Sequence, residues 1–188
     1  MLRCLAFFIV LLPVSLGCAQ PRTDPAETPV EEATLAQPAA VDTLTEVEQQ
    51  VQALLTKDGI HVVHFWAPWC HNSMSEFRKG VWNEIIAAHE DVTFIFVTVY
   101  NDGELSASVL EQHDIPDRVH TFAQPDHGNS NRRSNRRRAF LGLPLTWTPT
   151  TWIFNRNGKL AFALNYGEVR PALMASLFEN VSTNWSRH

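Results

Sequence analysis

The stretch from residue 60 to residue 73 constrains the fold most. An apolar, β-rich run from Ile60 to Trp66 predicts a buried strand, and Pro68 ends it. A helical pattern begins around Cys70 and extends to about residue 88. It consists of apolar residues at helical spacing, namely Met74, Phe77, Val81, Ile85 and Ile86. One cysteine is therefore expected at the point where a strand turns into a helix.

The position of Cys70 favours a reactive thiol. The first backbone N–H groups of a helix have no partner within the helix and carry partial positive charge, so they stabilise a thiolate. The thiolate is the nucleophilic form of cysteine near neutral pH. The alternative is a buried cysteine that acts as a small apolar residue.

The residues around Cys70 resemble a known family. The run Phe65-Trp66-Ala67-Pro68-Trp69-Cys70 is similar to the active-site segment of the thioredoxin-like superfamily, especially the exported disulfide reductases of the TlpA/ResA type. That family places a second cysteine three residues after the first, where this chain has Ser73. No disulfide can join position 73 to Cys70, which excludes a reductase that draws two electrons from that pair. Ser73 is expected to donate a hydrogen bond to the thiolate one turn away, or to start a capping box, and both roles are compatible.

A second segment carries the same resemblance. The run Thr146-Trp147-Thr148-Pro149-Thr150-Thr151-Trp152 is similar to the family segment in which a cis proline packs against the active cysteine. The resemblance implies that Pro149 is cis and that the backbone of Thr148 pairs with an extended substrate. The alternative is a trans proline at the start of an edge strand.

Two histidines and Trp69 complete the candidate site. His64 occupies the position at which thioredoxins have a buried acid, and it could act as a base near pH 7. The chain lacks the second cysteine that such a base would deprotonate. We therefore favour the interpretation of His64 as a core histidine with one hydrogen bond. A protonated His71 would stabilise the thiolate, with an exposed helix-start residue as the alternative. The histidines and Met74 lack ligand spacing, so no metal site or cofactor is expected.

The N-terminal residues predict export. Arg3, an apolar core and small residues before position 18 form a signal over residues 1–17. Ser15-Leu16-Gly17-Cys18 resembles a bacterial lipobox, in which Cys18 would be lipidated and become the mature N-terminus. The lipid would anchor the protein in the periplasm or cell envelope. An ordinary signal-peptidase site is the alternative. Residues 18–41 are rich in Pro, Ala, Glu and Thr and are expected to form a disordered tether.

The rest of the chain predicts one α/β domain over residues 42–183, followed by a short tail at 184–188. Helices are expected near 44–55, 70–88, 104–113 and 170–181, and strands near 60–66, 91–100, 150–155 and 160–164. A helical turn is expected at 139–143, and a loop at 114–135. The first two strands should be parallel, and Asn157-Gly158 should close a hairpin between the last two. This is the thioredoxin architecture, with a central mixed four-stranded sheet and helices on both faces.

Composition narrows the function classes. The chain has three cysteines, too few for a disulfide scaffold, and its net charge of −5 argues against a nucleic-acid binder. Five arginines between Arg132 and Arg138 are interpreted as a solvated loop, and contact with anionic lipid or an acidic partner is a weaker hypothesis.

Two functions remain open. The first is an exported monothiol protein that exchanges disulfides through Cys70. Its partners would be protein thiols or disulfides and an external thiol reductant, and it would be a monomer. The second is a redox-inactive module of the same fold that holds extended peptides or a partner protein beside Pro149. In either case no nucleic acid is expected as a partner.

Overall fold

The computed structural model describes residues 43–182. The expected signal, the lipidation site at Cys18, the tether and the tail at 184–188 lie outside these residues. Within residues 43–182, none of the helices has the length and apolar character needed to cross a bilayer.

A mixed five-stranded sheet forms the centre of the domain. Its strand order is β3-β2-β1-β6-β7, in which β1, β2 and β3 are parallel and β6 and β7 are antiparallel to their neighbours. The strands are β1 (Ile60–Trp66), β2 (Val92–Thr98), β3 (His120–Ala123), β6 (Thr150–Phe154) and β7 (Leu160–Asn165). The predicted α/β fold class is confirmed, with one strand more than expected.

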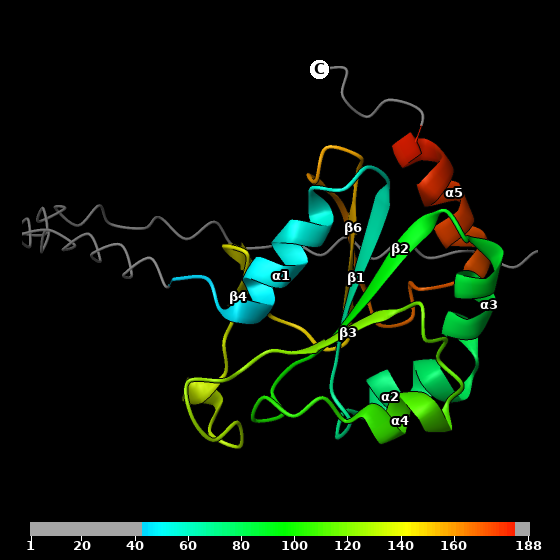
Figure 1. Ribbon diagram of the computed structural model, residues 1–188. Helices are drawn as coiled ribbons and strands as arrows, with labels where there is room; N and C mark the ends of the chain where they lie inside the picture. The colour runs from blue at the N-terminus through cyan, green and yellow to red at the C-terminus, as the bar shows by residue number, and fades with distance from the viewer. Residues whose placement is uncertain (1–42, 183–188) are drawn as a thin grey trace, which may run out of the picture. The chain divides into compact units, whose positions relative to one another are not determined.

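Helices cover both faces of the sheet (Figure 1). One face carries α1 (Glu46–Leu55) and the other carries four helices. These are α2 (His71–Arg78), α3 (Val81–Ala88), α4 (Ala107–Gln112) and α5 (Pro171–Ser182).

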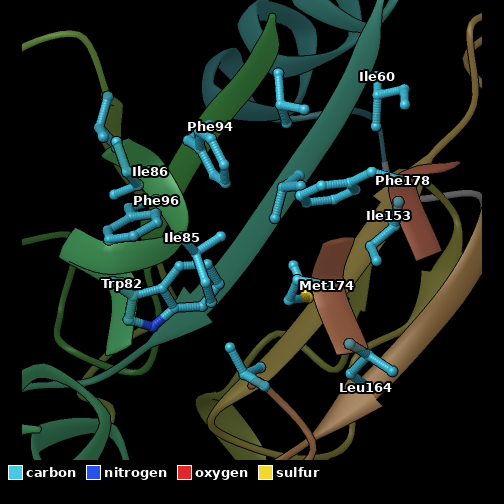
Figure 2. Packing of buried hydrophobic residues seen from close by; sticks show 14 of the residues in the cluster. Ile60, Trp82, Ile85, Ile86, Phe94, Phe96, Ile153, Leu164, Met174 and Phe178 are labelled. Carbon is cyan, nitrogen blue, oxygen red and sulfur yellow. The ribbon is translucent and has the colours of Figure 1, made fainter. Parts of the chain in front are cut away.

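The alternation of side chains along β1 divides the core in two. Val62 and Trp66 pack with α3 and α5, in a cluster that includes Trp82 and Phe178 (Figure 2). On the other face, Phe65 packs with residues of α1 and with later segments of the chain, namely Val51, Leu54, Phe140, Leu145 and Trp152. All seven residues of β1 are buried, which explains why the strand is mostly apolar apart from His61 and His64.

Three local predictions were wrong. The single helix expected over 70–88 is two helices, because Gly80 adopts a left-handed φ of 64° between α2 and α3. The loop expected at 114–135 contains the short edge strand β3. The helical turn expected at 139–143 is a small antiparallel ribbon of β4 (Ala139–Phe140) and β5 (Leu143–Pro144).

The predicted hairpin between β6 and β7 is confirmed. Its turn is closed by the N–H of Gly158, which donates to the carbonyl of Asn155 at 2.9 Å, and Gly158 has a φ of 66°. This turn lies at the end of the sheet opposite Cys70, because Phe154 pairs with His61 near the start of β1.

Candidate active site

Cys70 lies between the end of β1 and the first turn of α2. It is the N-cap residue, with extended φ and ψ of −83° and 115°, and its carbonyl accepts the first helical hydrogen bond from Met74 N–H at 3.0 Å. Its own N–H donates to the carbonyl of Ala67 at 3.0 Å. The strand-to-helix position predicted for Cys70 is therefore the one observed. Its side chain is half-buried, which leaves it partly open to solvent.

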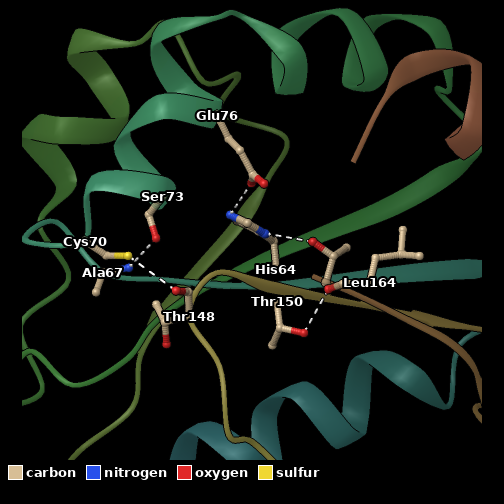
Figure 3. Close-up of polar contacts among 9 residues, drawn as sticks. His64, Ala67, Cys70, Ser73, Glu76, Thr148, Thr150 and Leu164 are labelled. Carbon is tan, nitrogen blue, oxygen red and sulfur yellow. Dashed lines mark hydrogen bonds and ion pairs between the residues drawn. The ribbon is translucent and has the colours of Figure 1, made fainter. Parts of the chain in front are cut away.

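The sulfur of Cys70 meets the segment before Pro149. Its thiol Sγ donates to the carbonyl oxygen of Thr148 at 3.3 Å, across 78 positions of sequence (Figure 3). The Thr148–Pro149 peptide bond is cis, as the family resemblance implied. Pairing of β1 with β6, in which Phe65 is opposite Thr150, brings these two segments together.

Ser73 is fully buried one turn into α2. Its Oγ accepts a hydrogen bond from the backbone N–H of Ala67 at 3.3 Å, so the hydroxyl fixes the turn between β1 and α2 (Figure 3). The capping box expected to begin at Ser73 is wrong, because the helix already begins at His71 and Cys70 is its cap. The expected donation from Ser73 to a Cys70 thiolate stays a prediction.

His64 is buried in the core behind the site. Its Nδ1 lies 3.0 Å from Oγ1 of Thr151, and its ring packs against those of Phe77, Trp82 and Phe96. Burial lowers the pKa of His64 to about 3, so the imidazole is neutral near pH 7. This environment agrees with the interpretation of His64 as a core histidine with one hydrogen bond.

Glu76 is a buried acid that was not expected from the sequence. Its Oε2 lies 3.7 Å from Nε2 of His64, which is beyond hydrogen-bond distance. Burial raises the pKa of Glu76 to about 7, and the nearby Trp82 indole and Gly167 backbone offset this only in part. Glu76 follows Ser73 by three positions, so both side chains lie on the buried face of α2 (Figure 3). The signal in the sequence that could have indicated a buried acid is the position of Glu76 next to the apolar residues of the predicted helix.

Two exposed tryptophans flank the sulfur. Trp69 is 52% exposed, and its indole Nε1–H donates to the carbonyl of Tyr100 at 2.8 Å. The guanidinium of Arg136 covers the Trp69 ring at 4.9 Å from its centroid. Trp147, directly before Thr148, is 70% exposed. Large apolar rings that remain in solvent beside a thiol are typical of a surface that contacts another molecule.

The remaining candidates lie apart from these contacts. His71 is exposed at the first residue of α2. His61 and His64 are three positions apart on β1 and therefore point to opposite faces. Across residues 43–182, no cluster of three or more histidine, cysteine or acidic side chains is arranged to hold a metal ion.

The sequence of this domain matches a known family. Residues 47–182 match the family model described as thioredoxin-like domain. The chain belongs to the thioredoxin-like family. The resemblance inferred from residues 65–70 and 146–152 is thereby confirmed at the level of this family.

Several solved structures are similar to this thioredoxin-like chain. DsbF of Mycobacterium tuberculosis is 20% identical, with 70% of this chain and 85% of that chain covered and a TM-score of 0.44. A secreted M. tuberculosis disulfide oxidoreductase homologous to E. coli DsbE is 18% identical, with 69% and 84% covered and a TM-score of 0.44. A DsbF homologue from Corynebacterium diphtheriae is 17% identical, with 66% and 73% covered and a TM-score of 0.48. No curated protein shows significant similarity to the sequence.

Proposed function

We propose that this thioredoxin-like protein carries out thiol–disulfide exchange through the single thiol of Cys70. The observation that carries the proposal is the half-buried Cys70 sulfur at the start of α2, 3.3 Å from the carbonyl that precedes cis Pro149. A sulfur at a helix N-terminus is suited to attack a disulfide, and the backbone segment beside it could position one.

The first step is attack of the Cys70 thiolate on one sulfur of a substrate disulfide. A new S–S bond forms to Cys70, and the other substrate sulfur leaves as a thiolate with the electron pair of the broken bond. The product is a mixed disulfide. The hydroxyl of Ser73 cannot displace it, so a second thiol must attack and restore the Cys70 thiolate. This requirement favours isomerisation or removal of mixed disulfides over net reduction.

Each neighbouring residue has a role in this scheme. The backbone of Thr148 would pair with an extended substrate segment beside Pro149. The exposed rings of Trp69 and Trp147 would contact residues near the substrate disulfide. His71, exposed at the helix start, would stabilise the thiolate when protonated. His64 lies in the core, where its ring packs against Phe77 of α2, and no step of this scheme uses it.

The protein is further proposed to act outside the cytoplasm. This proposal is supported by the signal-like residues 1–17 and by the lipobox-like run that ends at Cys18. It places the protein in a bacterial periplasm or cell envelope, where disulfides persist. Mass spectrometry of the mature N-terminus tests it: a lipidated Cys18 is expected, and an unlipidated N-terminus at another residue would contradict the anchor.

Trapping in cells tests the exchange function. The wild-type protein and Cys70→Ser are purified from the envelope fraction under conditions that block free thiols, and adducts are released with a reductant. Wild type should carry reducible protein adducts that the variant lacks. Equal amounts of adduct on both proteins, or none on either, would contradict exchange through Cys70.

The second candidate is a redox-inactive module that binds peptides. The replacement of a resolving cysteine by Ser73 and the 70% exposure of Trp147 favour it. In this case Cys70→Ser would retain every protein that co-purifies non-covalently with the wild type, and Trp147→Ala would lose these proteins. The same purification therefore distinguishes the two functions.

A further inference from the structure

A small cationic cavity lies beside the candidate active site. It has a volume of about 230 Å³ and is lined by Tyr100, Arg133, Arg136, Arg138, Thr146 and Trp147. Three of these residues carry a guanidinium, and none is acidic. The arginines were expected in a solvated loop, but three of them converge on one cavity.

The cavity adjoins the Cys70 sulfur through the residues on both sides of it. Trp147 directly precedes Thr148, whose carbonyl accepts from the thiol at 3.3 Å. On the other side, Tyr100 accepts a hydrogen bond from the indole of Trp69, the residue before Cys70. The guanidinium of Arg136 lies over both rings, 4.9 Å from the Trp69 centroid and 5.3 Å from the Tyr100 centroid. The cavity therefore lies next to residues that flank the Cys70 sulfur on both sides.

The positive charges of this cavity are not neutralised by ion pairs. Arg136 Nε donates to the carbonyl of Ser130 at 2.7 Å, which holds the side chain in place. Across residues 43–182, no carboxylate forms an ion pair with Arg133, Arg136 or Arg138. Asp126 acts on Arg136 only at longer range. The arrangement is one that binds an anion, because a fixed guanidinium matches the geometry of a carboxylate.

We propose that this cavity binds the carboxylates of a small acidic thiol while that thiol is joined to Cys70 as a mixed disulfide. The inference rests on the exchange function proposed above, which requires a thiol from outside the chain. The volume is below that of pockets that enclose drug-sized ligands, so the cavity takes the charged end of a small molecule. Its aromatic walls, Tyr100 and Trp147, pack against the rest of that molecule.

The reaction consumes one free small thiol, because the mixed disulfide supplies the other small-thiol sulfur. The Cys70 thiolate attacks the small-thiol sulfur of a mixed disulfide between that thiol and a substrate protein, and the protein thiolate leaves with the electron pair. A second small thiolate then attacks the same sulfur. It releases the Cys70 thiolate and leaves as a symmetrical small disulfide. The substrate protein regains its free thiol, and one free small thiol is oxidised into a disulfide with the small-thiol sulfur that the mixed disulfide supplied.

The test compares disulfides of different charge. Purified protein is reacted with oxidised glutathione, which carries carboxylates, or with neutral hydroxyethyl disulfide, and the rate of adduct formation on Cys70 is followed by mass spectrometry. The variant R133S/R138S removes two guanidinium groups from the cavity. It leaves Arg136 in place over the rings of Trp69 and Tyr100. The matched control R132S/R156S removes the same charge from exposed positions that do not line the cavity.

R133S/R138S should react roughly tenfold more slowly with oxidised glutathione and less than about twofold more slowly with hydroxyethyl disulfide. The control should keep the wild-type preference. An equal loss in the control, or an equal loss with both disulfides, would overturn the cavity proposal and leave the exchange function intact. The same variant is also reacted with an acidic peptide that carries a disulfide. If R133S/R138S is slower with this peptide but not with oxidised glutathione, the cavity binds protein substrates and the small-thiol proposal is overturned. A Cys70 that reacts with none of these disulfides would overturn the exchange function, and this inference with it.

Discussion

Ser73 determines how much of an exchange cycle the protein can complete alone. Its side chain is fully buried and holds the N–H of Ala67, so it has a structural task in the turn between β1 and α2. An oxygen in this place cannot form a disulfide with Cys70, one helical turn away. A chain with this residue must hand its mixed disulfide to another thiol.

Substitution Ser73→Cys should restore an internal dithiol. We expect a disulfide between positions 70 and 73 after mild oxidation, with a loss of about 1 kcal/mol in unfolding free energy because sulfur is a weak acceptor for Ala67 N–H. Ser75→Cys, a half-buried position on the same helix near Tyr166, is the matched control. Peptide mapping without reductant locates the bond. If both thiols of S73C stay free after oxidation, positions 70 and 73 are not placed to form a disulfide, which would contradict the structure of this turn.

Glu76 should make the stability of the protein depend on pH. Burial raises its pKa from 4.5 to about 7, so the folded state holds this proton more tightly than the unfolded chain. Its stabilising contribution is complete below about pH 4.5 and is lost as the pH rises towards 7. Glu76→Gln does not titrate, and its unfolding free energy relative to wild type should therefore rise by roughly 3 kcal/mol between pH 4 and pH 8.

Urea unfolding at several pH values measures this difference. Glu84→Gln, at an exposed position on α3, corrects for the general loss of one negative charge. His64, whose pKa burial lowers, is present in all three proteins, so its own titration largely cancels in the comparison. A difference between E76Q and wild type that stays constant across this range would contradict the assigned environment of Glu76.

The residues of the candidate site differ in how far the sequence could predict them. Cys70 and Pro149 lie in short segments whose neighbours are diagnostic, and the structure brings them together as expected. Glu76 was missed because a charged helix residue is expected in solvent, and only packing against Trp82 and His64 buries it. The cavity arginines were missed because nothing local indicates where a polar loop folds.

At the scale of elements, the break between α2 and α3 sets the direction of both helices. Gly80 adopts a φ of 64°, and an added Cβ would meet no atom within 4 Å. Gly80→Ala should therefore lower the unfolding free energy by about 1–2 kcal/mol, through the left-handed backbone alone. Gly80→Asn should lose less, because asparagine tolerates this conformation. Thermal unfolding compares the two, and an alanine variant as stable as wild type would show that the helix is continuous.

The elements that escaped prediction have weak local signals. β3 has four residues and lies at the sheet edge with partly exposed side chains, so no apolar run marks it. The ribbon of β4 and β5 has two residues in each strand, and Leu145 N–H donates to the carbonyl of Arg138 to extend it. By contrast, β1 and β2 are nearly fully buried and could be predicted from their apolar residues.

At the scale of the described domain, the last helix completes the larger core. Met174 is fully buried and Phe178 nearly so, and both pack in the cluster with Trp82 and Phe94. Met174→Ala should lower the unfolding free energy by about 2–5 kcal/mol, because the cavity cannot collapse fully. Ser176→Ala, at an exposed position two residues later, should change it by less than about 0.5 kcal/mol. Equal effects of the two substitutions in urea unfolding would contradict this docking of α5.

The candidate site also depends on the whole domain. Cys70 follows a central strand, and Thr148 precedes the neighbouring strand from the last third of the chain. Their contact forms only when β6 adds to β1, so local motifs become a site through the sheet. The same pairing brings Trp147, which lines the cavity, next to the residue that contacts the sulfur.

A two-stage reaction of the purified protein tests the central claim most directly. Hydroxyethyl disulfide is added first, and the excess reagent and the mercaptoethanol that leaves are then removed. Peptide mapping locates the adduct, a second thiol is added, and the loss of the adduct is followed. We predict one adduct on Cys70 that persists until the second thiol arrives and is then released completely, and no adduct at this position in Cys70→Ser. A Cys70 that forms no adduct, or an adduct that resolves before any thiol is added, would contradict the account.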